Sequence, residues 1–321
     1  MQENIAFPVR NLVFSLQENI RKAIVGKDDA IELMLIALLC KGHVLIEDVP
    51  GVGKTTLASA LSKSLSCTFK RIQFTPDVTP SDVTGYTMLN VKTGAMEFRE
   101  GAVMSQIVLA DEINRTSPKT QSALLEVMEE NQATIDGQTY QMPRPFMVLA
   151  TQNPVDFVGT YPLPEAQMDR FFLRISIGYP TVEEEALILE KYSGQVTPMQ
   201  EIRPVCSAQD IIDLQTAVRD VYASPEVRLY AARIAHMTRN NPALLLGASP
   251  RGSIALVKAA QARALLSGRN YILPDDVRIM TIPVLTHRLV LNPEARMNGV
   301  SASGVLSDIL SGLQVPVSKR L

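Results

Sequence analysis

Hydrophobic and polar positions follow two different patterns along the chain, and the change falls near residue 180. Before that point, short apolar runs typical of buried strands are separated by segments with helical spacing. The predicted strands are 44–46, 68–74, 107–110, 146–151 and 171–177, and the predicted helices are 9–24, 28–40, 57–65 and 118–130. Strands that alternate with helices predict a mostly parallel sheet with helices on both faces.

Two hairpins are predicted to interrupt this alternation. The first spans 86–98 and turns near Lys92-Thr93-Gly94. The second spans 133–140, where Asp136-Gly137 is a strong signal for a two-residue turn. Both are therefore expected as insertions into an α/β core.

Beyond residue 180 nearly every segment has helical periodicity. The predicted helices are 182–192, 208–221, 225–240, 251–266, 274–287 and a short one at 304–313. The chain is therefore predicted to have two domains, an α/β domain at 1–180 and an all-helical domain at 181–321 that carries the C-terminal tail.

Composition narrows the class of protein. Among 321 residues there are 31 Lys and Arg against 33 Asp and Glu, a net charge of -2, so no overall positive field attracts nucleic acid. The longest apolar stretch, 33–39, is too short to span a bilayer. Three distant cysteines and the lack of a signal segment are typical of a reducing compartment. A cytoplasmic protein without membrane insertion is expected.

The segment Glu47-Asp-Val-Pro-Gly-Val-Gly-Lys-Thr-Thr56 lies between a predicted strand and a predicted helix, as a phosphate-binding P-loop requires. Lys54 is expected to reach the β- and γ-phosphates, and the Thr55 hydroxyl to hold Mg²⁺. The backbone of Pro50, Gly51, Val52, Gly53 and Thr56 is expected to surround the phosphates. The usual motif starts with Gly, whereas Asp48 occupies that position here.

Asp111 and Glu112 end the apolar strand at 107–110. Asp111 is a candidate for the Mg²⁺ shell, and Glu112 for the base that deprotonates the attacking water. Two solvated acids at a strand end are the alternative. Asn153 ends the next strand, where its amide is a candidate for contact with the γ-phosphate or the water. The alternative is a turn residue before Pro154.

Two arginines complete the candidate set. Arg170 is a candidate arginine finger, a planar cation that stabilises charge on the transferred phosphoryl group. A structural ion pair with Asp169 or Glu165 is the alternative. Arg251 begins a helix of the second domain and is expected to reach the γ-phosphate of a nucleotide bound between the domains. An ordinary Arg at a helix start is the other reading.

With these elements in this order, the chain resembles the AAA+ ATPases, specifically the MoxR family. The resemblance rests on four runs: 48–55, Leu109-Ala-Asp-Glu-Ile-Asn-Arg115, Ala150-Thr-Gln-Asn-Pro154 and Glu165-Ala-Gln-Met-Asp-Arg-Phe171. Ser249-Pro-Arg251 adds to it. Asp48 in place of the first Gly also looks like this family.

The resemblance implies a P-loop NTPase αβα core with the AAA+ insertions and a helical lid. It implies ATP and Mg²⁺ as cofactors, Val25 and Gly26 beside the adenine, Asn153 as sensor 1, Arg170 as a finger acting on a neighbouring subunit, and Arg251 as sensor 2. It also implies a homo-oligomer in the form of a hexameric ring, a von Willebrand factor A domain partner and a client protein.

The expected function is ATP hydrolysis coupled to remodelling or activation of other proteins. Three alternatives remain open at this point. One is a DNA-associated motor of the same insertion-bearing clade, which the near-neutral charge disfavours. A kinase of a small substrate is disfavoured by Arg170 and Arg251. A binding module without hydrolysis is disfavoured by the pair Asp111 and Glu112.

Overall fold

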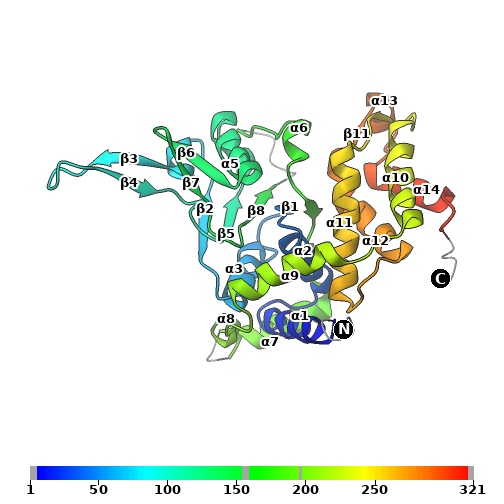
Figure 1. Cartoon of the computed structure of the whole chain (residues 1–321), viewed down its shortest axis with the longest axis horizontal. Helices are drawn as coiled ribbons and strands as arrows, with labels where there is room; N and C mark the ends of the chain where they lie inside the picture. Colours follow the sequence, from blue (N-terminus) through cyan, green and yellow to red (C-terminus); the bar gives the residue numbers. More distant parts are fainter. Residues whose placement is uncertain (1–5, 154–158, 195–196, 317–321) are drawn as a thin grey trace.

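A five-stranded parallel sheet forms the centre of the molecule. The computed structural model describes residues 6–153, 159–194 and 197–316 (Figure 1). The strand order is β2-β5-β8-β1-β9, with all neighbours parallel. The strands are β1 (Val44–Glu47), β2 (Phe69–Gln73), β5 (Ile107–Asp111), β8 (Met147–Gln152) and β9 (Leu173–Ile175). The prediction of a mostly parallel sheet is confirmed, and all five predicted strands belong to it, with β9 shorter than expected.

Apolar residues cover both faces of the sheet. Along β1, Val44 and Ile46 belong to one hydrophobic cluster and Leu45 to another, because successive side chains point to opposite faces. The first face packs against α1 (Ala6–Arg21), α2 (Asp28–Leu39) and α3 (Lys54–Ser64). The second packs against α4 (Pro80–Thr84) and α5 (Pro118–Glu130), with η1 (Ile113–Arg115) leading into α5.

Both predicted hairpins are confirmed. The first consists of β3 (Gly85–Leu89) and β4 (Met96–Glu100), and it extends far from the rest of the molecule (Figure 1). The second consists of β6 (Gln132–Ile135) and β7 (Gln138–Gln141). Phe98 stacks on Tyr140 with ring centroids 4.0 Å apart, so the two hairpins support one another.

The second half of the chain is mainly helical. Its helices are α7 (Val182–Tyr192), α8 (Pro198–Glu201), α9 (Ala208–Asp220), α10 (Pro225–Arg239), α11 (Pro250–Leu266), α12 (Pro274–Leu285), η2 (Thr286–Arg288), α13 (Pro293–Met297) and α14 (Ala302–Gly312). The expectation of an all-helical domain is wrong in one detail, because β10 (Leu244–Leu246) pairs with β11 (Val290–Leu291). Strands of three and two residues are too short to show the alternation of apolar and polar positions that predicts a strand.

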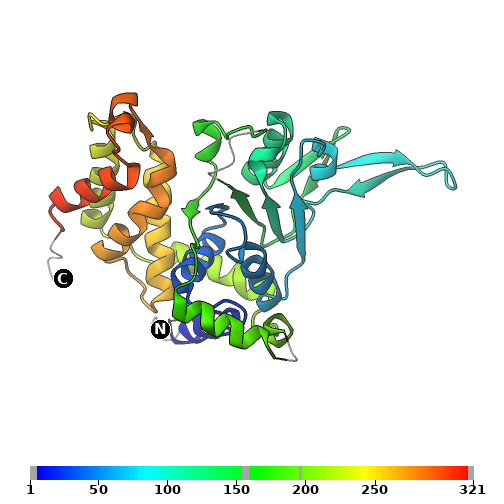
Figure 2. The ribbon, with the colours of Figure 1, turned by 180° about the vertical axis from the view of Figure 1, so that it is seen from behind.

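Helices of this second half occupy two places. Helices α7, α8 and α9 lie at the same end of the molecule as α1 and α3 (Figure 1). Helices α10 to α14 instead form a separate group on one side of the sheet (Figures 1 and 2). Gln215 of α9 donates to the carbonyl oxygen of Leu38 in α2 at 2.8 Å. One hydrophobic cluster contains residues from both sides of residue 180, so the division there stays a prediction. Among the described helices, none is long and apolar enough to cross a bilayer.

A cavity formed by the P-loop and three strand ends

The P-loop lies between the carboxyl end of β1 and the start of α3. Gly51 and Gly53 have φ of 86° and 92°, the left-handed region that favours glycine, so the backbone turns sharply into the helix. A cavity of about 370 Å³, here called the P-loop cavity, opens above this turn. Its lining residues come from four elements that meet at the carboxyl edge of the sheet: Pro50, Gly51, Gly53, Lys54, Thr55, Thr56, Arg71, Gln73, Asp111, Glu112 and Asn153.

The sequence predicted most of this lining. The P-loop residues, Asp111, Glu112 and Asn153 come together as expected, because parallel strands bring their carboxyl ends to one edge. Val52 instead packs against the hydrophobic core. Residues 154–158 lie outside the described residues, so the turn predicted at Pro154 is not described.

Asp48 anchors the P-loop to the chain that follows β9. Its buried carboxylate accepts hydrogen bonds from the Ser176 hydroxyl at 3.0 Å, from the Gly178 N–H at 2.9 Å and from the Ile177 N–H. The Asp48 carbonyl oxygen accepts a bond from Lys54 Nζ at 2.9 Å. The residue that replaces the first Gly of the motif therefore fixes the loop in place.

Replacing Asp48 with Ala is expected to lower the melting temperature by several degrees. The substitution leaves two backbone N–H groups without their acceptor, which costs about 1–3 kcal/mol for each buried group. Asp48→Asn keeps one acceptor oxygen and should lose less. Differential scanning fluorimetry checks this, with exposed Asp77→Ala as the matched control. A melting curve of Asp48→Ala that overlays the control would contradict the anchoring role.

The two carboxylates at the end of β5 are both held by neighbours. Asp111 accepts a bond from the Thr151 hydroxyl at 2.5 Å and pairs with Arg71, whose Nη2 lies 2.6 Å from Oδ2. Glu112 has φ of 57°, and its N–H donates to the Thr151 hydroxyl at 2.9 Å. Its Oε2 accepts from Gln73 Nε2 at 3.0 Å and pairs with Arg115 at 3.1 Å.

Arg71 and Gln73 were not predicted from the sequence as site residues. They lie two residues apart on β2, so their side chains share one face of that strand. Only the sheet order, which places β2 beside β5, brings them to the acidic pair. The alternating pattern at 68–74 predicts a strand but does not predict which strand lies beside it.

Oxygen donors suited to Mg²⁺ line the P-loop cavity. Mg²⁺ is usually bound by one or two protein oxygens together with waters and substrate phosphates. The Thr55 hydroxyl and the Asp111 carboxylate fit this requirement. Among the described residues, no group of three or more His, Cys, Asp or Glu is placed to hold a metal ion.

The turn predicted beside the adenine adjoins the P-loop. A Cβ built on Gly53 would lie 3.9 Å from Ile24 Cδ1, which places this turn against the loop. Gly26 has φ of 69°, and a Cβ there would overlap the Glu184 side chain of α7. Val25 and Gly26 do not line the P-loop cavity. Their contact with adenine stays a prediction.

Arg170 and Arg251 lie in a different place from the P-loop. They line a second cavity of about 320 Å³, here called the arginine cavity, together with Lys41, Gly42 and His43. These last residues precede β1, whereas the P-loop follows it. The Phe172 N–H bonds to the His43 carbonyl oxygen at 2.8 Å, which holds the segment after Arg170 at the amino end of β1.

Arg251 does not line the P-loop cavity of its own chain, and its contact with the γ-phosphate of a nucleotide bound between the domains stays a prediction. Its Nη2 lies 2.7 Å from Glu129 Oε1, and Nε of Arg170 lies 3.0 Å from Oε2 of the same carboxylate. An ion pair of Arg170 with Asp169 or Glu165 was the alternative from the sequence, and the observed partner is Glu129. Both arginines therefore meet the same carboxylate in the arginine cavity.

Buried polar contacts connect the core, beside Arg170, to the group of elements from α10 to α14, here called the lid. Arg288 pairs with Asp169 at 2.7 Å and donates to the carbonyl oxygens of Phe171 at 2.7 Å and Phe172 at 3.2 Å. His287 Nε2 lies 3.0 Å from the Phe171 carbonyl oxygen. Burial lowers the pKa of His287 well below its usual range, so the ring is neutral near pH 7. These contacts hold Asp169 and Arg170 against the lid.

His43 connects three elements in its neutral form. Nε2 donates to the Met128 carbonyl oxygen of α5 at 2.9 Å, and Nδ1 accepts from the Val148 N–H of β8 at 2.9 Å. Burial lowers the pKa of His43 to about 4 from 6.5. In the unfolded chain His43 therefore binds a proton below about pH 6.5, whereas in the folded chain it binds one only below about pH 4.

Acidification is consequently expected to destabilise the protein. The contribution of neutral His43 to the free energy of unfolding is fully present above about pH 6.5 and is smaller by about 2 kcal/mol at about pH 5. His43→Gln, which keeps a donor and an acceptor, should lose less melting temperature between about pH 7.5 and about pH 5. His287 shifts in the same direction, so some loss remains. A pH dependence equal to that of exposed His236→Gln would contradict this role.

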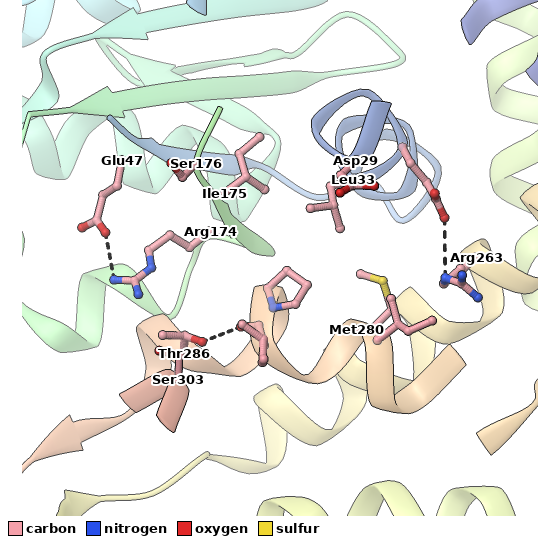
Figure 3. Close-up of a pocket in the computed structure, with 14 residues that line it drawn as sticks. Asp29, Leu33, Glu47, Arg174, Ile175, Ser176, Arg263, Met280, Thr286 and Ser303 are labelled. Carbon is pink, nitrogen blue, oxygen red and sulfur yellow. Dashed lines mark hydrogen bonds and ion pairs between the residues drawn. The ribbon is translucent and has the colours of Figure 1, made fainter. Parts of the chain in front are cut away.

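A larger cavity of about 600 Å³ lies between the core and the lid, but no P-loop residue from 48 to 56 lines it. Glu47 and Arg174 form an ion pair of 2.9 Å on its core side, and Met280 of α12 and Thr286 of η2 lie opposite (Figure 3). The P-loop cavity, although smaller, contains the loop and both carboxylates. It is therefore the candidate nucleotide site.

Comparisons with known proteins identify the family of the chain. Residues 43–173 match the model of the ATPase family associated with various cellular activities (AAA), and residues 236–309 match an AAA lid domain. The chain is 52% identical to YeaC, an uncharacterised protein of Bacillus subtilis, over 94% of each chain. It is 41% identical to Chaperone MoxR1 of Mycobacterium tuberculosis, over 98% of this chain and 85% of that one.

A solved structure extends the likeness to three dimensions. A protein of Cytophaga hutchinsonii that is proposed to be an ATPase superposes with a TM-score of 0.92, at 37% identity and over 98% of both chains. Together with the strand order and the P-loop cavity, these relatives show that the chain belongs to the MoxR family of AAA+ ATPases.

Proposed function

We propose that the protein hydrolyses ATP to ADP and phosphate and couples this reaction to remodelling or activation of partner proteins. The observation that carries the proposal is the P-loop cavity, where Lys54, Thr55, Asp111, Glu112 and Asn153 meet although they are distant in sequence. Family membership supports ATPase activity in general.

The residues of the cavity divide the chemistry among them. Lys54 leaves its bond to the Asp48 carbonyl oxygen and places its positive charge on the β- and γ-phosphates. Glu112 accepts a proton from the attacking water, and Asn153 orients that water or the γ-phosphate. Thr55 and Asp111 would hold Mg²⁺, which when bound neutralises charge developing on the phosphate oxygens.

Part of the site comes from a second copy of the chain. Arg170 and Arg251 line the arginine cavity and not the P-loop cavity of their own chain, so in this proposal they act on the nucleotide of a neighbour. The chain is then a homo-oligomer, with a hexameric ring, a von Willebrand factor A domain partner and a client protein proposed from the family. A cytoplasmic location is proposed on the same basis.

Phosphate release from Mg·ATP by the purified protein tests this function. Turnover that is lost in Lys54→Ala, without any phosphorylated acceptor, supports hydrolysis and excludes a small-substrate kinase. A rate raised by added DNA would favour a DNA-associated motor instead. ATP binding with no phosphate release at any protein concentration would contradict the proposal and indicate a binding module.

A further inference from the structure

A single carboxylate bridges the two arginines of the arginine cavity. Glu129 Oε2 lies 3.0 Å from Nε of Arg170, and Oε1 lies 2.7 Å from Nη2 of Arg251. Arg170 comes from the segment after α6 (Glu165–Met168), and Arg251 from the first turn of α11 in the lid. Glu129 therefore connects an arginine of the core with an arginine of the lid.

The arginine cavity has an excess of positive charge, which explains why the two arginines need a carboxylate between them. The arginine cavity is lined by five cations and two carboxylates: Lys41, Arg170, Arg251, Lys258 and Arg288 against Glu129 and Asp169. Two guanidinium groups side by side repel each other in surroundings with so few negative charges. Asp169 is already paired with Arg288. Glu129 is thus the carboxylate that offsets the charge of both arginines.

The position of Glu129 is fixed by the helix that carries it. It lies in the last turn of α5, whose C-cap is Asn131 with φ of 54°. The carbonyl oxygen of the preceding residue, Met128, accepts the bond from His43 at the start of β1. Because α5 is anchored there, the backbone that carries this carboxylate is held in place.

We propose that Glu129 is a positioning residue, which orients Arg170 and Arg251 together toward the triphosphate of a nucleotide bound by a second copy of the chain. This inference rests on the proposed function. Glu129 meets Arg170 at Nε, and a guanidinium group can make paired bonds with phosphate oxygens. Without Glu129 the two guanidinium groups separate, and misplacement of about 1 Å is enough to cost about 10²-fold in rate.

Mixing two inactive variants tests the proposal. Glu112→Gln serves as the arginine donor, since it lacks its own base but retains Arg170, Arg251 and Glu129. Arg170→Ala serves as the acceptor, since its P-loop cavity is intact. Mg·ATP turnover should appear in the mixture, because a donor's arginines complete an acceptor's site.

Glu129→Ala is then added to one partner at a time. In the donor it should reduce the turnover of the mixture by about tenfold or more, and in the acceptor it should leave turnover unchanged. Glu126→Ala, an exposed residue one turn earlier on α5, is the matched control and should have no effect in either partner. Glu129→Asp in the donor should restore part of the loss.

The possible failures are distinguishable. A parent mixture without turnover would overturn the shared site, and with it both the proposed function and this inference. Turnover that is unaffected by Glu129→Ala in the donor would overturn the inference alone. An equal loss in both arms would also overturn it, because it indicates damage to the fold. Glu129→Gln replaces Glu129→Ala if the latter does not fold, with the same asymmetry expected.

Discussion

Glu112→Gln is expected to lower the rate of ATP hydrolysis by about 10²–10⁴-fold and to leave ATP affinity nearly unchanged. Glutamine has the shape of glutamate but cannot take a proton from water. The backbone at Glu112 is fixed by the bond from its N–H to Thr151, so the substitution should not move the strand end. Phosphate release and the binding of a fluorescent ATP analogue measure the two effects separately.

Two further variants make this test specific. Glu130→Gln removes an exposed carboxylate at the end of α5 and should hydrolyse ATP like the unchanged protein. Gln73→Ala removes a bond of 3.0 Å to Glu112 and should alter the rate without abolishing it. Turnover of Glu112→Gln within a factor of about two of the unchanged protein would rule out Glu112 as the base.

Arg170→Ala is expected to lower turnover by about 10³-fold, the range found for arginine fingers in phosphoryl transfer. The chain should still bind ATP with its usual affinity, because Arg170 does not line its own P-loop cavity. Arg251→Ala should behave in the same way with a smaller loss, since its side chain is 52% exposed against 29% for Arg170.

An exposed arginine gives the control for this effect. Arg228→Ala on α10 removes the same charge from a residue that lines neither cavity and should keep full turnover. Isothermal titration with a non-hydrolysable ATP analogue checks the affinity. An Arg170→Ala protein that hydrolyses ATP normally, or one that loses ATP binding, would contradict a role at a neighbour's site.

The regular elements and the P-loop cavity were the part best predicted from the sequence. Helices α5 and α7 begin and end at the predicted residues, because each has a clear start: Ser117 before Pro118, and Thr181 capping α7. The Asp136-Gly137 turn places the second hairpin for a similar local reason. Such signals need only neighbouring residues.

Contacts that depend on tertiary placement were not predictable in this way. Arg71 reaches Asp111 only because β2 lies beside β5, and the alternating pattern of a strand does not name its neighbour. Glu129 meets Arg251 only because the lid stands beside the sheet, and a resemblance of motifs does not place one domain against another. The pairing of Arg251 with Glu129 could therefore not be predicted from the sequence.

The central claim is that one chain holds the P-loop and the acidic pair while a second copy supplies the arginines. The most direct test is the rate of ATP hydrolysis per chain across a dilution series in which sedimentation shows assemblies separating into single chains. The rate is predicted to fall as the assemblies separate, and Arg170→Ala is predicted to stay low throughout. A rate per chain that remains constant after the chains have separated would contradict the shared site.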